Sequence, residues 1–198
     1  MKLGYRTVGL GPISWEESFK ILAEIGYETV EICLEGSKFL EEESDLSELK
    51  SVKDSLEDSG LEVSAVSYHG DEVELSQKIE NTYRAIKIAD KLSAPVVIFN
   101  TEKRQPDQKE EQMLSVINRC RDFSQAGEAF GIKLAIEPEP GQVTHGLEET
   151  LLLLEEVNSS YLGVNLDIGH AYITDSNLLN TIEQLQDAIF HTHLEDIS

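Results

Sequence analysis

The chain has 198 residues, enough for one domain or two small ones, and 38 acidic against 16 basic residues give it a net charge of −22. Apolar residues make up 40% of the chain, which excludes a disordered protein, and no apolar run approaches the ~20 residues of a membrane span. The acidity argues against nucleic-acid partners, whose phosphates are bound mostly by Lys and Arg. Two cysteines, Cys33 and Cys120, cannot form a disulfide framework, so we expect a cytoplasmic protein with both as small apolar fillers.

Short apolar strands alternate with amphipathic helices along the whole chain. We expect seven strands, at residues 3–10, 28–34, 61–68, 94–100, 132–137, 162–167 and 189–194. Helical stripes of apolar residues lie between them, at 15–22, 46–56, 79–86, 113–123, 147–157 and 178–185. The repeat has a period of about 30 residues, which is typical of a parallel sheet covered by helices.

No Ser/Gly-rich linker or shift in composition divides the chain, so we expect a single domain over 1–198. Eight units of this period would make about 240 residues, close to the ~250 of a (β/α)8 barrel. The expected elements end at strand seven. We therefore predict an α/β fold of the (β/α)8 TIM-barrel type with about seven βα units, its last strand and helix missing. Its two unpaired edge strands predict a chain that is poorly stable, dimeric or both.

Alternation within the strands separates an apolar face from a polar one. Apolar and polar or small side chains alternate in 30–35, 132–137 and 162–167. In 189–194 we expect Ile189, His191 and His193 to share a face. A doubly wound sheet is apolar on both faces because helices cover both. A polar second face therefore favours a barrel whose interior opens into a site at the C-terminal ends of the strands.

Three successive strands end in residues that ligate metals: Glu137, Asp167 and His193. Taken one at a time, each residue also has an ordinary structural interpretation: Glu137 as a loop acid, Asp167 as the cap of a turn and His193 as a buried histidine. Two carboxylates and one imidazole together suit a hard or borderline divalent ion, Mn above all, with Mg, Co or Zn as alternatives. Their common face and position predict a divalent-metal site.

Four further polar residues lie near the same strand ends. His170 follows Asp167 through a Gly turn, His69 and Asn100 stand at the ends of strands three and four, and His191 lies one inward step below His193. We expect these four residues to contact the substrate or to support the metal ligands by hydrogen bonds.

A rival motif follows strand one. Gly9 and Gly11, with Glu31 twenty residues beyond Gly11, resemble a dinucleotide-binding fingerprint. The third glycine is absent, and Pro12 removes a backbone donor. We therefore do not favour a dinucleotide site.

Three segments resemble the xylose-isomerase-like barrel superfamily, in particular its sugar phosphate isomerase/epimerase branch: GIKLAIEPEPG at 131–141, LDIGHA at 166–171 and HTHLED at 191–196. The resemblance implies a metal held by Glu, Asp, His and a second Glu from strands five to eight. The first three fall on Glu137, Asp167 and His193, and His170 matches a position that contacts substrate. The second Glu would lie on strand eight, and Val143 stands where ketose 3-epimerases as a group carry a Glu.

These residues predict a divalent-metal isomerase or epimerase acting on a small sugar, sugar phosphate, sugar acid or polyol-derived ketone. The metal would chelate the carbonyl and a neighbouring hydroxyl, and Glu137 would move the adjacent proton. A metal-dependent dehydratase of the same fold, as in inositol catabolism, is the main alternative. An endonuclease IV-type phosphodiesterase and a non-catalytic binding barrel are further alternatives, the former disfavoured by the acidity.

Overall fold

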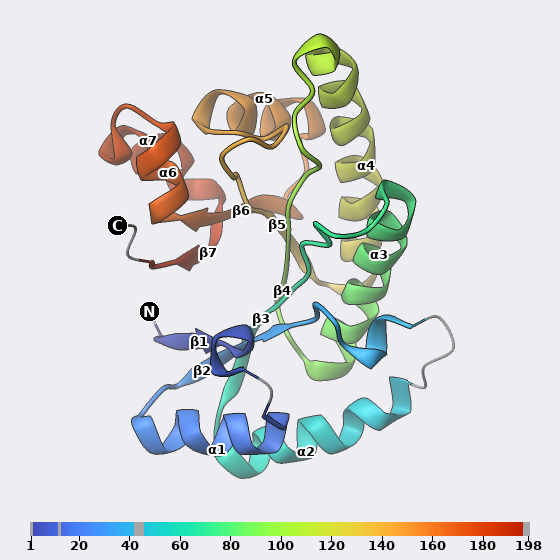
Figure 1. The fold of residues 1–198 in the computed structure, drawn as a ribbon, viewed down its shortest axis with the longest axis vertical. Coiled ribbons are helices and arrows are strands. Elements are labelled where there is room, and N and C mark those ends of the chain that lie inside the picture. The colour runs from blue at the N-terminus through green and yellow to red at the C-terminus, as the bar shows by residue number, and fades with distance from the viewer. Residues whose placement is uncertain (1, 12, 42–45, 196–198) are drawn as a thin grey trace.

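The computed structural model describes residues 2–11, 13–41 and 46–195, with only the backbone of Glu48; Pro12 and Asp196 lie outside the described residues. Seven parallel strands form one sheet in sequence order (Figure 1). The strands are β1 Gly4–Arg6, β2 Thr29–Cys33, β3 Glu62–Ser67, β4 Val96–Phe99, β5 Lys133–Ile136, β6 Leu162–Asp167 and β7 Ile189–His193. The helices are α1 Trp15–Ile25, α2 Leu49–Ser59, α3 Leu75–Leu92, α4 Lys109–Phe130, α5 Leu147–Val157, α6 Ile168–Thr174 and α7 Leu178–Leu185.

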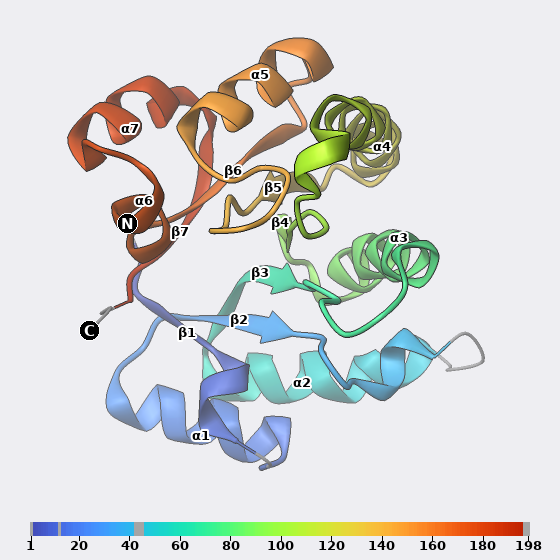
Figure 2. The same cartoon turned by 45° about the horizontal axis from the view of Figure 1, so that its top comes forward.

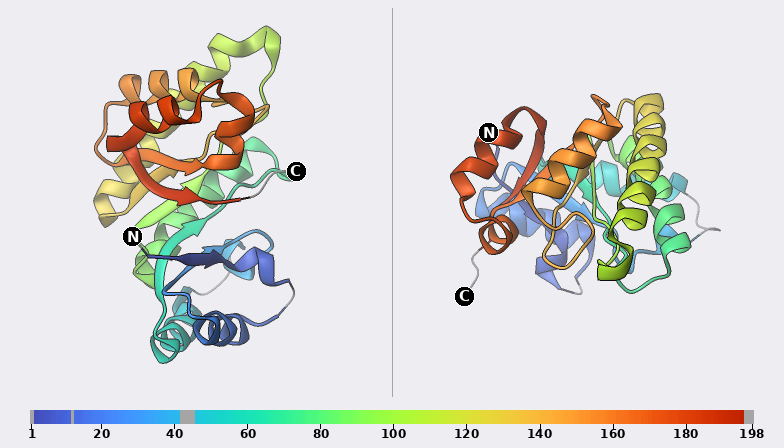
Figure 3. Two further views of the ribbon diagram at one scale, coloured as in Figure 1. Left: turned by 90° about the vertical axis from the view of Figure 1, so that its left-hand side faces the viewer. Right: turned by 90° about the horizontal axis from the view of Figure 1, so that it is seen from above.

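The sheet curls into an open barrel with its helices on the outside (Figure 2). Within the described residues, β1 and β7 each pair with one neighbour, so they are the two edges of the sheet. Figure 3 shows these edge strands facing each other across the opening. The predicted (β/α) barrel with seven strands is therefore confirmed. None of the described helices is long and apolar enough to cross a membrane.

The two faces of the sheet differ as the alternation predicts. Outward-facing side chains of the strands join the helices in one apolar core, among them Val30, Leu134 and Val164. Inward-facing apolar side chains form only a small second cluster of Ala65, Val96, Ile98 and Ala135 with Phe190 against it. The rest of the described inner face is mostly polar.

Two expectations about the strands are wrong. The strand expected at 3–10 ends at Arg6, and a 3-10 helix over Thr7–Leu10 follows. The buried Thr7 hydroxyl accepts the backbone N–H of Cys33 at 3.0 Å, so the chain turns onto the end of β2 instead of extending.

The second error concerns β7. Ile189 pairs with Val164, whereas His191 pairs with Asn165, so Phe190 is the extra residue of a β-bulge. Because of this extra residue, the alternation of side chains between the two faces of the sheet is not continuous along β7. Ile189 packs against the outer core, and it does not share a face with His191 and His193 as expected.

The dinucleotide-binding alternative does not fit this fold. The sheet runs in sequence order, without the reversal of strand order at which dinucleotides bind. Glu31, which would have to face a ribose, is buried against His193.

Candidate metal centre

Glu137, Asp167 and His193 converge at the C-terminal ends of β5, β6 and β7. One ligand atom from each lies within 4.8 Å of the others. Nδ1 of His193 is 3.4 Å from Oε1 of Glu137 and 3.7 Å from Oδ2 of Asp167. Two ligands at ~2.0–2.2 Å from one ion are separated by distances of this size. The structure thus brings the three predicted ligands together, and their role as ligands stays a prediction.

Asp167 divides its two oxygens between two tasks. It is the N-cap of α6, where the sequence indicated a turn, and its Oδ1 accepts the backbone N–H groups of Gly169 at 2.8 Å and His170 at 3.0 Å. Oδ2 is left facing His193. The helix start therefore fixes the carboxylate with one oxygen directed at the candidate ion.

Glu137 is held in the same manner. Its Oε2 accepts Nδ2 of Asn165 at 2.9 Å and lies 3.0 Å from Nε2 of His69, while Oε1 faces His193. Burial opposes the charge, but hydrogen bonds with His193 and His69 hold the pKa of Glu137 well below its usual range. Glu137 is consequently an ionised, oriented carboxylate, which is the form that binds a metal.

His193 completes the group from the edge strand. Its Nε2 lies 2.7 Å from Oε2 of Glu31, on the opposite side from Nδ1. Burial favours the neutral ring, but hydrogen bonds with Glu137 and Glu31 outweigh it and raise the pKa of His193 to about 10. A divalent ion would replace the proton that compensates the carboxylates around Nδ1.

The donor set fits a divalent ion. His170 adds a nitrogen, because its Nδ1 lies 3.6 Å from Oε1 of Glu137 and is buried without a hydrogen-bond partner among the described residues. Buried polar atoms are normally paired, so an unpaired nitrogen facing the carboxylates indicates a missing partner. Oxygen and imidazole donors suit Mn, Mg, Co and Zn.

The other predicted residues fall into two groups. His69 and His170 line the cleft and approach Glu137. His191 lines it at a deeper level, where Nδ1 lies 3.0 Å from Oδ1 of Asn165 and orients that amide. Asn100 does not line the cleft; its Nδ2 donates to Oε1 of Glu139 at 2.8 Å.

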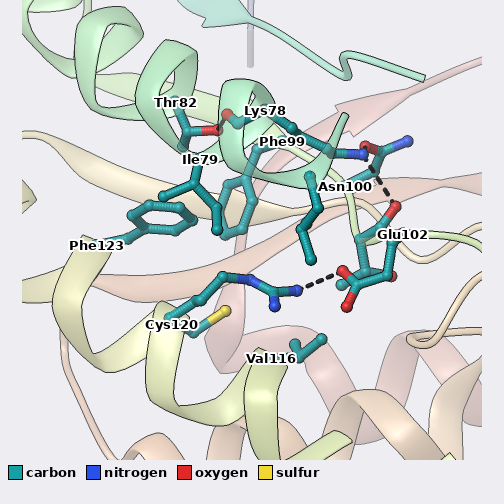
Figure 4. Close-up of a pocket in the computed structure, with 12 residues that line it drawn as sticks. Lys78, Ile79, Thr82, Phe99, Asn100, Glu102, Val116, Cys120 and Phe123 are labelled. Carbon is teal, nitrogen blue, oxygen red and sulfur yellow. Dashed lines mark hydrogen bonds and ion pairs between the residues drawn. The ribbon is translucent and has the colours of Figure 1, made fainter. Parts of the chain in front are cut away.

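Lys78 explains the position of Asn100. This nearly buried lysine of α3 donates to Oδ1 of Asn100 at 2.5 Å and to the carbonyl of Thr101 at 3.0 Å. Figure 4 shows its ammonium beside the Asn100 amide, next to a small pocket between α3 and α4. In the described residues, that pocket shares none of its lining with the cleft of the metal centre.

Sequence reasoning missed several polar residues around the centre. Glu139 lines the cleft with its Oε1 3.7 Å from Nε2 of His69, and burial raises its pKa despite the hydrogen bond from Asn100. Arg6 and Glu35 approach Nδ1 of His69 at 2.9 and 3.3 Å. The signal for Glu139 was its place two residues after Glu137. Arg6 and Glu35 carry no comparable motif.

A family model described as "Xylose isomerase-like TIM barrel" matches residues 19–198. The chain belongs to this family. Two curated dehydratases are similar to it. The 3-dehydroshikimate dehydratase of Bacillus anthracis is 27% identical over 72% of this chain and 52% of its own length. The inosose dehydratase of Mesomycoplasma hyopneumoniae (strain J) is 22% identical over 94% of this chain and 64% of its own length. The chain therefore spans about half to two thirds of these relatives.

Solved structures of the xylose isomerase-like family share the fold. A 3-keto-D-glucoside 4-epimerase from E. coli superposes with a TM-score of 0.82 and 19% identity, over 99% of this chain and 79% of that one. A structure described as the IolI protein with a zinc atom gives a TM-score of 0.79 and 20% identity, over 99% and 73% of the two chains. Relatives of this fold thus include dehydratases and epimerases, and one of these structures holds a metal.

Proposed function

We propose that this barrel forms the site of a divalent-metal-dependent dehydratase that removes water from a small polyhydroxylated ketone. The observation that carries the proposal is the convergence of Glu137 Oε1, Asp167 Oδ2 and His193 Nδ1, each with its other polar atom held by the protein. The dehydratase names of the curated relatives support elimination as the outcome.

The bound metal would polarise the ketone and acidify the neighbouring C–H. Glu137 is the base that the sequence predicts, but its Oε2 is already occupied by His69 and Asn165. Glu139 lies two residues further, at the wall of the cleft and outside the proposed ligand set. Asn100 and Gln142 each donate to one of its oxygens, and burial raises its pKa. We propose that Glu139 takes the proton from the C–H and gives it to the neighbouring hydroxyl, which leaves as water when its C–O bond breaks, while Glu137 serves as ligand.

The charge of the cleft favours an uncharged substrate. In the described part of the chain, the cleft is lined by ten carboxylates. Its lysine and arginine side chains are only two, Lys2 and Arg6. Arg6 is already paired with Glu31 and Glu35. A phosphate or carboxylate group would meet like charges here, so a neutral ketone such as an inosose suits the cleft better than a sugar phosphate.

An epimerase is the second candidate, because both reactions begin by removing a proton next to a metal-chelated carbonyl. The fold of the E. coli epimerase favours it. Val143, where ketose 3-epimerases carry a Glu, is buried in the apolar core, 3% exposed, and cannot contact a substrate in the cleft. This position favours the dehydratase over a ketose 3-epimerase.

The test is incubation of the Mn²⁺-loaded protein with an inosose in D₂O, followed by NMR. A dehydratase loses water, whereas an epimerase exchanges the C–H and retains the hydroxyl. Glu139→Gln should retain Mn²⁺ binding and lower turnover by about 10²–10⁴-fold, the usual value of a general acid–base group. Glu137→Gln should lose Mn²⁺ itself. Exchange or turnover that is unaffected by removing the metal would contradict the proposal.

A further inference from the structure

Glu31 is a buried carboxylate of β2 outside the set of proposed ligands. The residue is 3% exposed. Its Oε2 lies 2.7 Å from Nε2 of His193 on β7, and its Oε1 lies 3.0 Å from Nε of Arg6 on β1. Because an unpaired buried charge is costly, such a carboxylate persists only where partners compensate it. Its partners are a cation from one edge strand and a proposed ligand from the other.

The two nitrogens of His193 face different groups. Nδ1 faces Oε1 of Glu137 and Oδ2 of Asp167 and lies 3.0 Å from the amide Nδ2 of Asn165, whereas Nε2 faces Glu31. When the neutral ring carries its proton on Nε2 and uses it in a hydrogen bond to Glu31, Nδ1 is unprotonated and has a free lone pair. Nδ1 is the nitrogen that points to the other proposed ligands.

We propose that Glu31 is a positioning residue that fixes the tautomer and rotation of His193, so that this histidine binds the metal through Nδ1. The inference rests on the metal site of the proposed function. A carboxylate behind a ligating imidazole holds the ring in place and raises its basicity. On metal binding, any proton on Nδ1 passes to solvent, and the Nε2 proton remains in its hydrogen bond to Glu31.

Arg6 extends this arrangement to the first strand. Its Nε pairs with Oε1 of Glu31 and also donates to Oγ of Ser67 at 3.3 Å. Since β1 and β7 are the two edges of the open sheet (Figure 3), the Arg6–Glu31–His193 chain of contacts spans the opening. One ligand on β7 is therefore oriented from the N-terminal strands.

The experiment compares Zn²⁺ affinity, by calorimetry, in the wild type, Glu31→Gln and Glu31→Leu. All three side chains have similar volume, but only Glu and Gln accept a hydrogen bond from Nε2. Glu31→Leu should weaken Zn²⁺ binding by about 10–100-fold, the usual loss when the partner of a ligating histidine is removed, and Glu31→Gln by less. Glu149→Gln is the matched control, because Glu149 is also a buried, ion-paired carboxylate, on α5 beside Arg104 and Lys109. It should bind Zn²⁺ like the wild type.

A spectroscopic readout separates positioning from a merely structural role. In ¹⁵N NMR of the Zn²⁺-loaded wild type, His193 should carry the metal on Nδ1 and a slowly exchanging proton on Nε2. Glu31→Gln should retain this state, and Glu31→Leu should lose the protected proton. If Glu31→Leu does not fold, metal on Nε2 or a rapidly exchanging Nε2 proton in the wild type would still overturn the inference.

Two results distinguish this inference from the proposed function. If the wild type and Asp167→Asn bind Zn²⁺ equally, the metal site itself is wrong, and the role of Glu31 falls with it. If Asp167→Asn loses binding but folded Glu31→Leu binds within twofold of the wild type, only the role of Glu31 is wrong.

Discussion

The outer and inner faces of the sheet use alternate residues of the same strands, yet different forces hold them. On the outer face, Leu134 and Val164 are fully buried in an apolar core with the helices. On the inner face, Glu31, Glu137 and Asn165 are nearly as buried, at 3, 3 and 0% exposed, and are held by hydrogen bonds across the barrel. Burial alone therefore does not separate core from site in this protein, whereas the polarity of the buried group does.

The two faces should respond differently to substitution. Truncating an outer residue leaves a cavity whose cost depends on how far the neighbours can collapse. Removing an inner residue leaves a charged or polar partner buried without compensation. Substitutions on the outer face should therefore lower stability and leave metal binding unchanged, whereas substitutions of the proposed ligands on the inner face should lower metal binding as well.

The largest effect on stability is expected for Leu134→Ala on β5. Leu134 is fully buried, so the substitution should lower the free energy of unfolding by about 2–5 kcal/mol in denaturant titrations. The metal affinity of the folded fraction should not change. Leu152→Ala on α5 is the control, because Leu152 is 44% exposed and should change stability by no more than about 0.5 kcal/mol. Equal losses in both variants would contradict the assignment of the outer core.

A smaller loss is expected for a substitution at Gly163, on the inner face of β6. A Cβ at Gly163 of β6 would lie 2.4 Å from the carbonyl oxygen of Ala188 and 2.5 Å from the ring of Phe190. Gly163→Ala should therefore cost about 1–3 kcal/mol of unfolding free energy. In a Phe190→Ala background the cost should fall by at least about 0.5 kcal/mol, because the two sites share a contact. If the free-energy costs of Gly163→Ala and Phe190→Ala simply add in the double variant, the bulge at Phe190 does not constrain Gly163.

The smallest effect concerns the pH dependence of stability at the rim of the inner face. Burial opposes the charge of Glu35, but hydrogen bonds with His69 and Cys33 lower its pKa to about 2. A lowered pKa stabilises the folded state above the ordinary value of about 4.5, and this contribution disappears as the pH falls through 2. The stability difference between the wild type and Glu35→Gln should thus shrink from pH 5 to pH 2. Since Glu35 is about one-third exposed, solvent screening keeps the difference small. A stability difference that stays constant from pH 5 to pH 2 would show that the pKa of Glu35 is not lowered.

The sequence predicted the order of the strands and the convergence of Glu137, Asp167 and His193, because strand ends in a parallel sheet share one edge. It did not predict the bulge at Phe190, since pairing register depends on the neighbouring strand and not on local pattern. It also missed the contact between Glu31 and His193. These residues are far apart in the sequence and meet only because the sheet curls, so alternation predicts their face but not their partner.

The arrangement around Glu139 shows the same limit. Its carboxylate is oriented by Asn100, whose amide is in turn oriented by Lys78 of α3. Lys78 reads in the sequence as an ordinary surface residue of a helix. Its burial follows from how α3 packs against the end of β4, which no periodicity within the helix specifies.

The most direct test of the metal centre is Mn²⁺ affinity in the wild type and in Asp167→Asn. Asn is as good an N-cap as Asp, so this variant keeps the start of α6 and replaces only the oxygen that faces His193. We expect the variant to stay folded and to lose Mn²⁺ affinity by more than the ~10–100-fold that loss of a supporting hydrogen bond costs. Asp175→Asn, at the other end of α6, should bind Mn²⁺ like the wild type. Equal Mn²⁺ affinity in the wild type and Asp167→Asn would contradict the claim that Glu137, Asp167 and His193 form one metal site.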